Sequence, residues 1–219
     1  MNYVENVYIC LAAPLIIAIV FVRDRGRRLL IFLLSGMTAC ILSSYISTFL
    51  ATAMGADTLS ASMELAPIVE ECMKFLPALF YITVFEPHKA EGSDSIIMSA
   101  IGFATFENVC FMTQNGATEL THLLIRGFGT GAMHVVCASI MAYGFLRVWD
   151  REWLRLAGTF ALLAMATTFH GCYNVLVAQP ARVANIGYAV PLLTTVLILF
   201  VSRHKRILAR RGRKVDYND

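Results

Sequence analysis

Hydrophobic residues along the chain form seven long blocks, separated by short stretches that hold most of the charge. Each block is long enough to cross the hydrocarbon of a bilayer, which takes about 20 residues of helix. Helix is the expected conformation, because a lipid-exposed chain must satisfy its own backbone hydrogen bonds and the alternation typical of a membrane β-barrel is absent. The predicted spans are 4–22, 29–51, 63–85, 95–113, 122–147, 154–178 and 186–202.

Composition agrees with this pattern. Hydrophobic residues make up 58% of the chain and charged residues 15%, whereas ordinary soluble domains are about 45–50% apolar. The first block has no basic segment before it and no cleavage site after it, so we expect a retained helix rather than a signal peptide. The sequence predicts an all-α, polytopic transmembrane helix bundle that forms a single domain over residues 1–219.

Basic residues mark alternate connections between the blocks. They follow the first, third, fifth and seventh blocks, and the intervening loops hold almost none. Because Lys and Arg are retained on the cytoplasmic side, the N-terminus is predicted to lie outside and residues 203–219 to form a basic cytoplasmic tail. No glycine-rich phosphate loop accompanies the basic clusters, so the expected partner is the lipid bilayer and not a nucleic acid. The sequence does not indicate an oligomeric state.

The third block carries Glu70, Glu71 and Lys74. Ionisable groups inside a spanning helix cost a few kcal/mol each, so they are candidates for function by default. Glu70 and Lys74 are four residues apart and share a helix face. They can form a purely structural clasp, but that interpretation leaves Glu71 without a partner.

Two further blocks carry polar residues at helical spacing. Glu107 follows Phe103 by four residues in the fourth block, and Asn174 follows His170 by four in the sixth. Each of these residues has a structural alternative, as a neutral hydrogen-bonded carboxyl or as a polar contact between helices.

The fifth block carries His134 in its middle and Arg126 near its start, and a lone histidine here is compatible with simple packing. We interpret Arg126 as a residue that extends to the outer membrane interface. Three small residues between them are expected to let another backbone approach closely, as in membrane helix packing; these are Gly127, Gly129 and Gly131.

Most of these polar residues are predicted to lie at a similar depth in the membrane. With alternating helix directions, Glu70, Glu107 and His170 lie about two turns from the outer ends of their helices, on the order of 10 Å deep at 1.5 Å per residue. His134 lies nearer the midplane. Unrelated structural residues have no reason to share a level, so we expect one convergent site whose core spans residues 63–178.

The residue types permit peptide hydrolysis. Glu70 or Glu71 is the candidate general base for a water nucleophile, with Lys74 as the neighbouring charge. Asn174 and a histidine are candidate donors to the oxyanion. A metal version is also open, because two histidines and a glutamate are one known catalytic zinc set, and His134, His170 and Glu107 supply it. Thiolate ligation by Cys110 or Cys137 is the less favoured alternative.

The ordered set resembles the PrsW family of intramembrane proteases. It consists of Glu70-Glu71-x-x-Lys74, Phe103-x-x-x-Glu107, His134 and His170-x-x-x-Asn174, on four successive predicted helices. The resemblance implies a metalloprotease in a bacterial plasma membrane that cuts a membrane-anchored protein, such as an anti-sigma factor, on its extracytoplasmic side. It also implies a relationship to the CAAX prenyl endopeptidases and bacteriocin-processing enzymes.

That wider superfamily differs at two positions. Related members have an arginine one residue beyond Lys74, and the CAAX proteases have a histidine where this chain has Glu107.

Two other functions are compatible with the sequence. A proton- or ion-coupled transporter uses the same residue types as a relay, but it is expected to show inverted repeats or broken helices, which the sequence lacks. A non-catalytic adaptor or immunity-type protein would keep these residues as structural contacts. It predicts that Glu70→Gln leaves function unchanged.

Overall fold

The computed structural model describes residues 3–116 and 119–215, and in this part of the chain it contains helices and no strand. The prediction of an all-α fold is confirmed. A short helix α3 (Thr58–Ser60) and a π-helical turn η1 (Ala61–Leu65) connect α2 to α4. The seven long helices are α1 (Val4–Phe21), α2 (Asp24–Met54), α4 (Ala66–Phe85), α5 (Lys89–Asn115), α6 (Leu120–Val148), α7 (Glu152–Val177) and α8 (Ala181–Val215).

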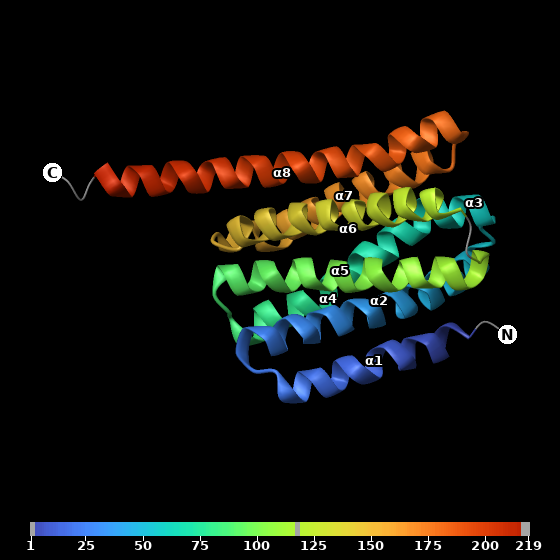
Figure 1. Cartoon of the computed structure of the whole chain (residues 1–219), viewed down its shortest axis with the longest axis horizontal. Helices are drawn as coiled ribbons and strands as arrows, with labels where there is room; N and C mark the ends of the chain where they lie inside the picture. The colour runs from blue at the N-terminus through green and yellow to red at the C-terminus, as the bar shows by residue number, and fades with distance from the viewer. Residues whose placement is uncertain (1–2, 117–118, 216–219) are drawn as a thin grey trace.

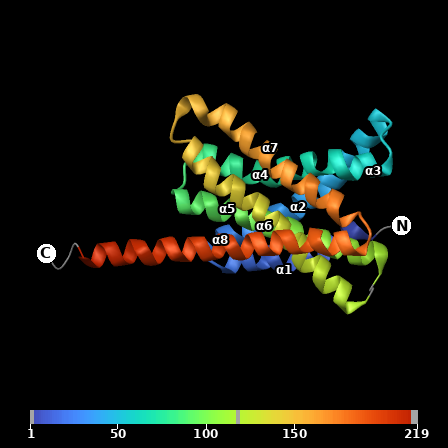
Figure 2. The ribbon, with the colours of Figure 1, turned by 90° about the horizontal axis from the view of Figure 1, so that it is seen from above.

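The long helices lie side by side, and α8 projects past the rest of the bundle toward the C-terminus (Figures 1 and 2). Among the described residues, six of them are long and apolar enough to cross a membrane. The exception is α4, because its 20 residues include three charged ones, Glu70, Glu71 and Lys74. A multi-pass helical membrane protein is therefore confirmed, while a seventh span and the orientation of the termini stay predictions.

The C-terminal helix extends past the last predicted span. Helix α8 contains the predicted span 186–202 and continues to Val215, so most of the predicted basic tail is helical. Residues 216–219 of that tail lie outside the described residues.

Two glycines bring α2 and α5 into backbone contact. A Cβ at Gly36 would lie 1.9 Å from the backbone oxygen of Ser99, and a Cβ at Gly102 would lie 1.9 Å from that of Leu33. Only glycine permits so close an approach. Because Glu107 lies little more than one turn beyond Gly102, this contact sets the position of its carboxylate beside α2.

The glycines of α6 behave differently from one another. A Cβ at Gly129 would lie 2.7 Å from the Tyr188 ring and 3.2 Å from its Cα, so the predicted close approach is confirmed there, with α8 as the partner. The prediction is wrong for Gly127, whose nearest described neighbour is an Asn108 nitrogen at 3.9 Å. It is also wrong for Gly131, where an added Cβ would have no described atom within 4 Å apart from its own stretch of helix.

The packing order explains how residues of four helices meet. Helix α4 packs against α2, α5 and α7, and α6 packs against α5, α7 and α8. The polar faces of α4, α5, α6 and α7 therefore turn toward a common interior.

Candidate active site

A chain of hydrogen bonds crosses from α4 to α6 and on to α5. Lys74 Nζ donates to Glu71 Oε1 at 2.5 Å and to His134 Nδ1 at 2.7 Å. With Nδ1 accepting, His134 carries its proton on Nε2, which donates to Glu107 Oε2 at 2.5 Å. Three of the four residues are almost fully buried, with Glu71 3%, Lys74 4% and His134 0% exposed.

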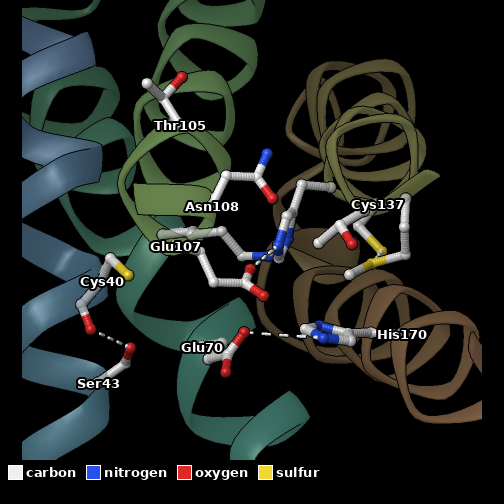
Figure 3. Close-up of polar contacts among 12 residues, drawn as sticks. Cys40, Ser43, Glu70, Thr105, Glu107, Asn108, Cys137 and His170 are labelled. Atoms are coloured by element: carbon white, nitrogen blue, oxygen red, sulfur yellow. Dashed lines mark hydrogen bonds and ion pairs between the residues drawn. The ribbon is translucent and has the colours of Figure 1, made fainter. Parts of the chain in front are cut away.

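His170 of α7 joins the same cluster. Its Nδ1 donates to Glu71 Oε1 at 2.7 Å, and its Nε2 lies 3.7 Å from Glu70 Oε2. Figure 3 shows this last contact as a dashed line, with Glu70 and Glu107 directed toward the same space. A neutral imidazole that donates through Nδ1 has a free lone pair on Nε2. The structure therefore brings together Glu70, Glu71, Lys74, Glu107, His134 and His170 from four helices.

The lysine partner differs from the sequence interpretation. Lys74 pairs with Glu71, three residues away, and not with Glu70, four residues away. Both spacings place residues on one helix face, and successive residues differ by about 100° around the helix. Glu71 consequently faces the interior, while Glu70 faces a cavity of about 780 Å³ that Glu107 also lines.

The ligand atoms of Glu70, His134 and His170 all lie within 4.8 Å of one another. Zinc holds such ligands at about 2.0–2.2 Å, so a small closure of side chains would bring them onto one ion. Glu71 holds His170 through Nδ1, as metal-bound histidines are commonly held. To hold an ion through Nε2, a neutral His134 would carry its proton on Nδ1 instead, which requires Lys74 Nζ to accept there rather than donate.

The donor set therefore fits a catalytic metal. It includes Glu70, whereas the sequence prediction had Glu107 as the carboxylate of the set. In the structure, Glu107 Oε2 lies 2.5 Å from His134 Nε2.

Arg126 does not extend to the membrane interface, so that interpretation was wrong. Its side chain is 14% exposed and its Nη2 lies 3.4 Å from Glu107 Oε1. Its Nη1 donates to Asn108 Oδ1 at 2.6 Å, and its Cζ lies 3.7 Å from the centre of the Phe111 ring. A carboxylate, an amide and an aromatic face together outweigh contact with the interface.

The sequence contained a signal for this contact. Arg126 precedes His134 by eight residues, which is about 80° beyond two full turns, so both fit on one broad helix face. Asn108 directly follows Glu107, and the prediction had given it no role.

Two predicted residues lie at the margin of the cluster. Asn174 Nδ2 donates to the backbone oxygen of Ser62 in η1 at 3.0 Å, so the structure ties it to η1 and not to the buried cluster. Phe103 lies beneath the cluster, with its ring 5.2 Å from that of His134. Of the cysteines weighed as ligands, Cys137 is buried against the Ala166 carbonyl, whereas Cys110 lines the same cavity as Glu70 and Glu107.

Comparison with known proteins gives one family. A family model described as PrsW family intramembrane metalloprotease matches residues 25–202, which is most of the chain and contains the whole cluster. No curated protein and no solved structure matches the chain.

Proposed function

Because the chain belongs to the PrsW family of intramembrane metalloproteases, we propose that it is an endopeptidase that hydrolyses a peptide bond of a membrane-anchored protein. The observation that supports this most strongly is the pair of carboxylates, Glu70 and Glu107, that line one cavity beside two buried histidines. Hydrolysis needs water, a base and a charged pocket at one place, and this cavity combines room for water with two carboxylates inside an apolar bundle.

Glu70 is the proposed general base. It lines the cavity and, unlike Glu71, is not bound to Lys74. In the proposed reaction a water proton passes to Glu70 while the water oxygen bonds to the scissile carbonyl carbon. Glu70 then returns that proton to the leaving nitrogen as the carbon–nitrogen bond breaks. Glu71 and Lys74 act on this reaction indirectly, by fixing His170 and His134.

Asn174 is proposed as a donor to the oxyanion. Its amide nitrogen carries two protons, and one of them is engaged by Ser62. The second is available to an oxygen that develops negative charge near His170, one helical turn away. Arg126, with Asn108, is proposed to hold Glu107 against His134.

The metal is proposed to be zinc. His134 and His170 would hold it together with one carboxylate, and it would supply Lewis-acid polarisation of the scissile carbonyl. Two carboxylates are candidates for the third ligand. The proximity of its ligand atom to those of the histidines favours Glu70, whereas the sequence prediction named Glu107.

Metal analysis of the purified chain separates the two assignments. Glu70→Gln and Glu107→Gln are compared with wild type, with His170→Ala as the variant expected to lose the ion. The variant of the true ligand loses stoichiometric zinc, and the variant of the base keeps zinc but loses activity. If wild type and His170→Ala contain no bound metal under any loading condition, the zinc assignment is refuted.

Reconstituted cleavage tests the activity itself. The full chain in proteoliposomes is mixed with single-span reporter peptides that carry a donor and a quencher around the segment next to the span. Glu70→Gln and His170→Ala are expected to abolish cleavage with folding unchanged, while Thr105→Val, an exposed position outside the cavity, should leave it intact. Full activity in a folded Glu70→Gln protein would refute the proposal and favour a non-catalytic role.

Substrate and setting are proposed from the family resemblance. We propose an anti-sigma-factor-like protein cut on the extracytoplasmic side of a bacterial plasma membrane, and a relationship to the CAAX protease superfamily. We also propose that residues 63–178 carry the reaction and that residues 203–219 are a basic cytoplasmic extension.

A further inference from the structure

The cavity beside Glu70 has a polar wall that the proposed chemistry does not use. It lies between the N-terminal part of α1, the second half of α2, the α3–η1 segment with the start of α4, and α5. Six hydroxyl-bearing residues of α2 line it, an unusual density for an apolar span. This α2 hydroxyl stripe consists of Ser43, Ser44, Tyr45, Ser47, Thr48 and Thr52.

The stripe presents oriented hydrogen-bonding groups. Thr48 Oγ1 donates to the backbone oxygen of Ser44, and Thr52 Oγ1 to that of Thr48, both at 2.8 Å. Each hydroxyl proton is thus turned into the helix, which leaves the oxygen lone pairs as acceptors. The Ser47 hydroxyl is buried and has no hydrogen-bond partner within residues 3–116 and 119–215. A buried hydroxyl without a partner costs free energy, so a ligand that pairs with it when the Ser47 side chain turns toward the cavity is favoured.

The wall opposite α2 carries mostly small side chains and ends at Glu70, the candidate base. Ala61, Ser62, Ala66 and Glu70 line it along η1 and α4. Small residues leave width for a chain between this wall and α2. The stripe and Glu70 therefore border one continuous space. Figure 3 shows Ser43 on α2 and Glu70 on α4, two residues of its opposite walls.

Size and polarity distinguish the possible occupants. A helix of 10–12 Å diameter with a 1.5 Å rise takes about 140 Å³ per residue, so a 20-residue span needs about 2,800 Å³. The cavity holds about 780 Å³, enough for only a few residues. A helical ligand also has its amides already bonded, whereas an extended segment brings free N–H and C=O groups that must find partners away from water.

We propose that this groove binds an extended stretch of the substrate, with the α2 hydroxyl stripe pairing with its backbone groups. The enzyme would thereby select membrane-anchored proteins whose segment beside the apolar span unwinds readily. The inference rests on the proposed function, because it takes Glu70 at the inner end of the groove as the group that attacks this segment.

Binding to the Glu70→Gln chain tests the groove without requiring cleavage. Two dye-labelled single-span peptides are used, in which the six residues beside the span are rich in glycine and serine or in alanine and leucine. By fluorescence anisotropy in micelles, the glycine–serine peptide should bind about tenfold more tightly. Adding Ser47→Ala, Thr48→Val and Thr52→Val should weaken its binding about tenfold, since several backbone hydrogen bonds are lost.

The control is Thr105→Val in the same background. Thr105 is also exposed and bonds back to its own helix, to Ile101 O at 2.7 Å, but it does not line the cavity. It should leave the Kd unchanged. Should the triple variant not fold, Ser47→Ala alone should weaken binding about two- to threefold, because it removes one unpaired hydroxyl.

Three results would refute the proposal that the groove binds an extended substrate segment. They are unchanged binding in the folded stripe variant, equal binding of both peptides, and binding of neither peptide. A peptide that binds through the stripe but is not cut by the wild-type chain would refute the proposed hydrolysis and leave the groove standing.

Discussion

At the residue scale, the site depends on a buried ion pair that is shared with two histidines. Lys74 donates to Glu71 and His134, and Glu71 also accepts from His170. Such a pair is tolerated inside a bundle only when its remaining hydrogen-bonding capacity is filled. The pair therefore serves to hold both histidine rings in fixed orientations, which a catalytic site requires.

Lys74→Met should destabilise the protein strongly. It leaves the Glu71 charge buried without its cation, and breaking one partner of a buried pair costs about 3–5 kcal/mol. Unfolding in detergent is the measurement, and the double variant Glu71→Gln with Lys74→Met should recover part of the loss. Lys89→Met is the matched control, because Lys89 pairs with Asp150 where both side chains are more than half exposed; such pairs contribute at most about 1 kcal/mol.

Arg126→Gln should lower activity with little loss of stability. The Glu107 carboxylate would lose its cationic partner, and loss of a residue that orients catalytic groups typically costs about 10–100-fold. The drop should appear in kcat more than in KM, and Arg126→Lys should rescue it only partly, because lysine lacks the planar fork. Arg155→Gln, also near an aromatic ring but remote from the cluster, should have no effect. Wild-type kcat in a folded Arg126→Gln protein would argue against a positioning role.

The identities of the site residues could be predicted because charges and imidazoles are conspicuous in apolar blocks. Their partners could not, since Glu70 and Glu71 both lie about one turn from Lys74 on α4, and only the packing of α4 decides which carboxylate is buried with Lys74. The α2 stripe was missed for a related reason. Ser and Thr bond back to their own helix, so they carry little penalty in a span and attract no notice.

At the scale of the elements, the contact between α2 and α5 positions the site. These helices meet through Gly36 and Gly102, with α2 carrying the hydroxyl stripe and α5 carrying Glu107. The sequence located the seven long helices, because each contains a long, mainly apolar block, including α4 with its three charged residues. It did not predict α3 or η1, which are too short to have a periodic pattern of their own.

Gly102→Ala should push α5 away from α2. The new methyl would lie 1.9 Å from a backbone oxygen that has no free rotation to relieve the clash. Overpacking of this kind costs about 1–3 kcal/mol or more, so a lower Tm and reduced activity are expected together. Gly131→Ala provides the comparison, because no described atom lies within 4 Å of its added carbon. Equal stability of the two variants would contradict the close contact.

At the scale of the whole molecule, the predicted orientation decides which face of the membrane the groove meets. The groove is lined by the start of α1, by α3 and by the end of α5, which lie at the end of the bundle that carries the N-terminus (Figure 1). The distribution of basic residues predicts that this end lies outside the cytoplasm. The orientation could be predicted from the sequence alone, because it follows from the distribution of basic residues. The groove could not, because it forms only when four helical segments pack together.

Surface labelling checks this orientation. In a cysteine-free background, Met54→Cys, at the exposed end of α2, should react with an impermeant maleimide in intact cells. His88→Cys, between α4 and α5, should react only after the membrane is permeabilised. Labelling both variants in permeabilised cells confirms that each thiol is reachable, and the reverse pattern in intact cells would invert the predicted topology.

The cluster also has a consequence for how such a sequence can diverge. Contacts run without a break from Glu70 through His170, Glu71, Lys74, His134 and Glu107 to Arg126. Neighbours in such a series are energetically coupled by about 0.5–3 kcal/mol, so their replacements do not add. We therefore expect residues of this series to change in pairs during evolution, with each replacement compensating for the other. A survey of single substitutions would underestimate the number of residue combinations that the site tolerates.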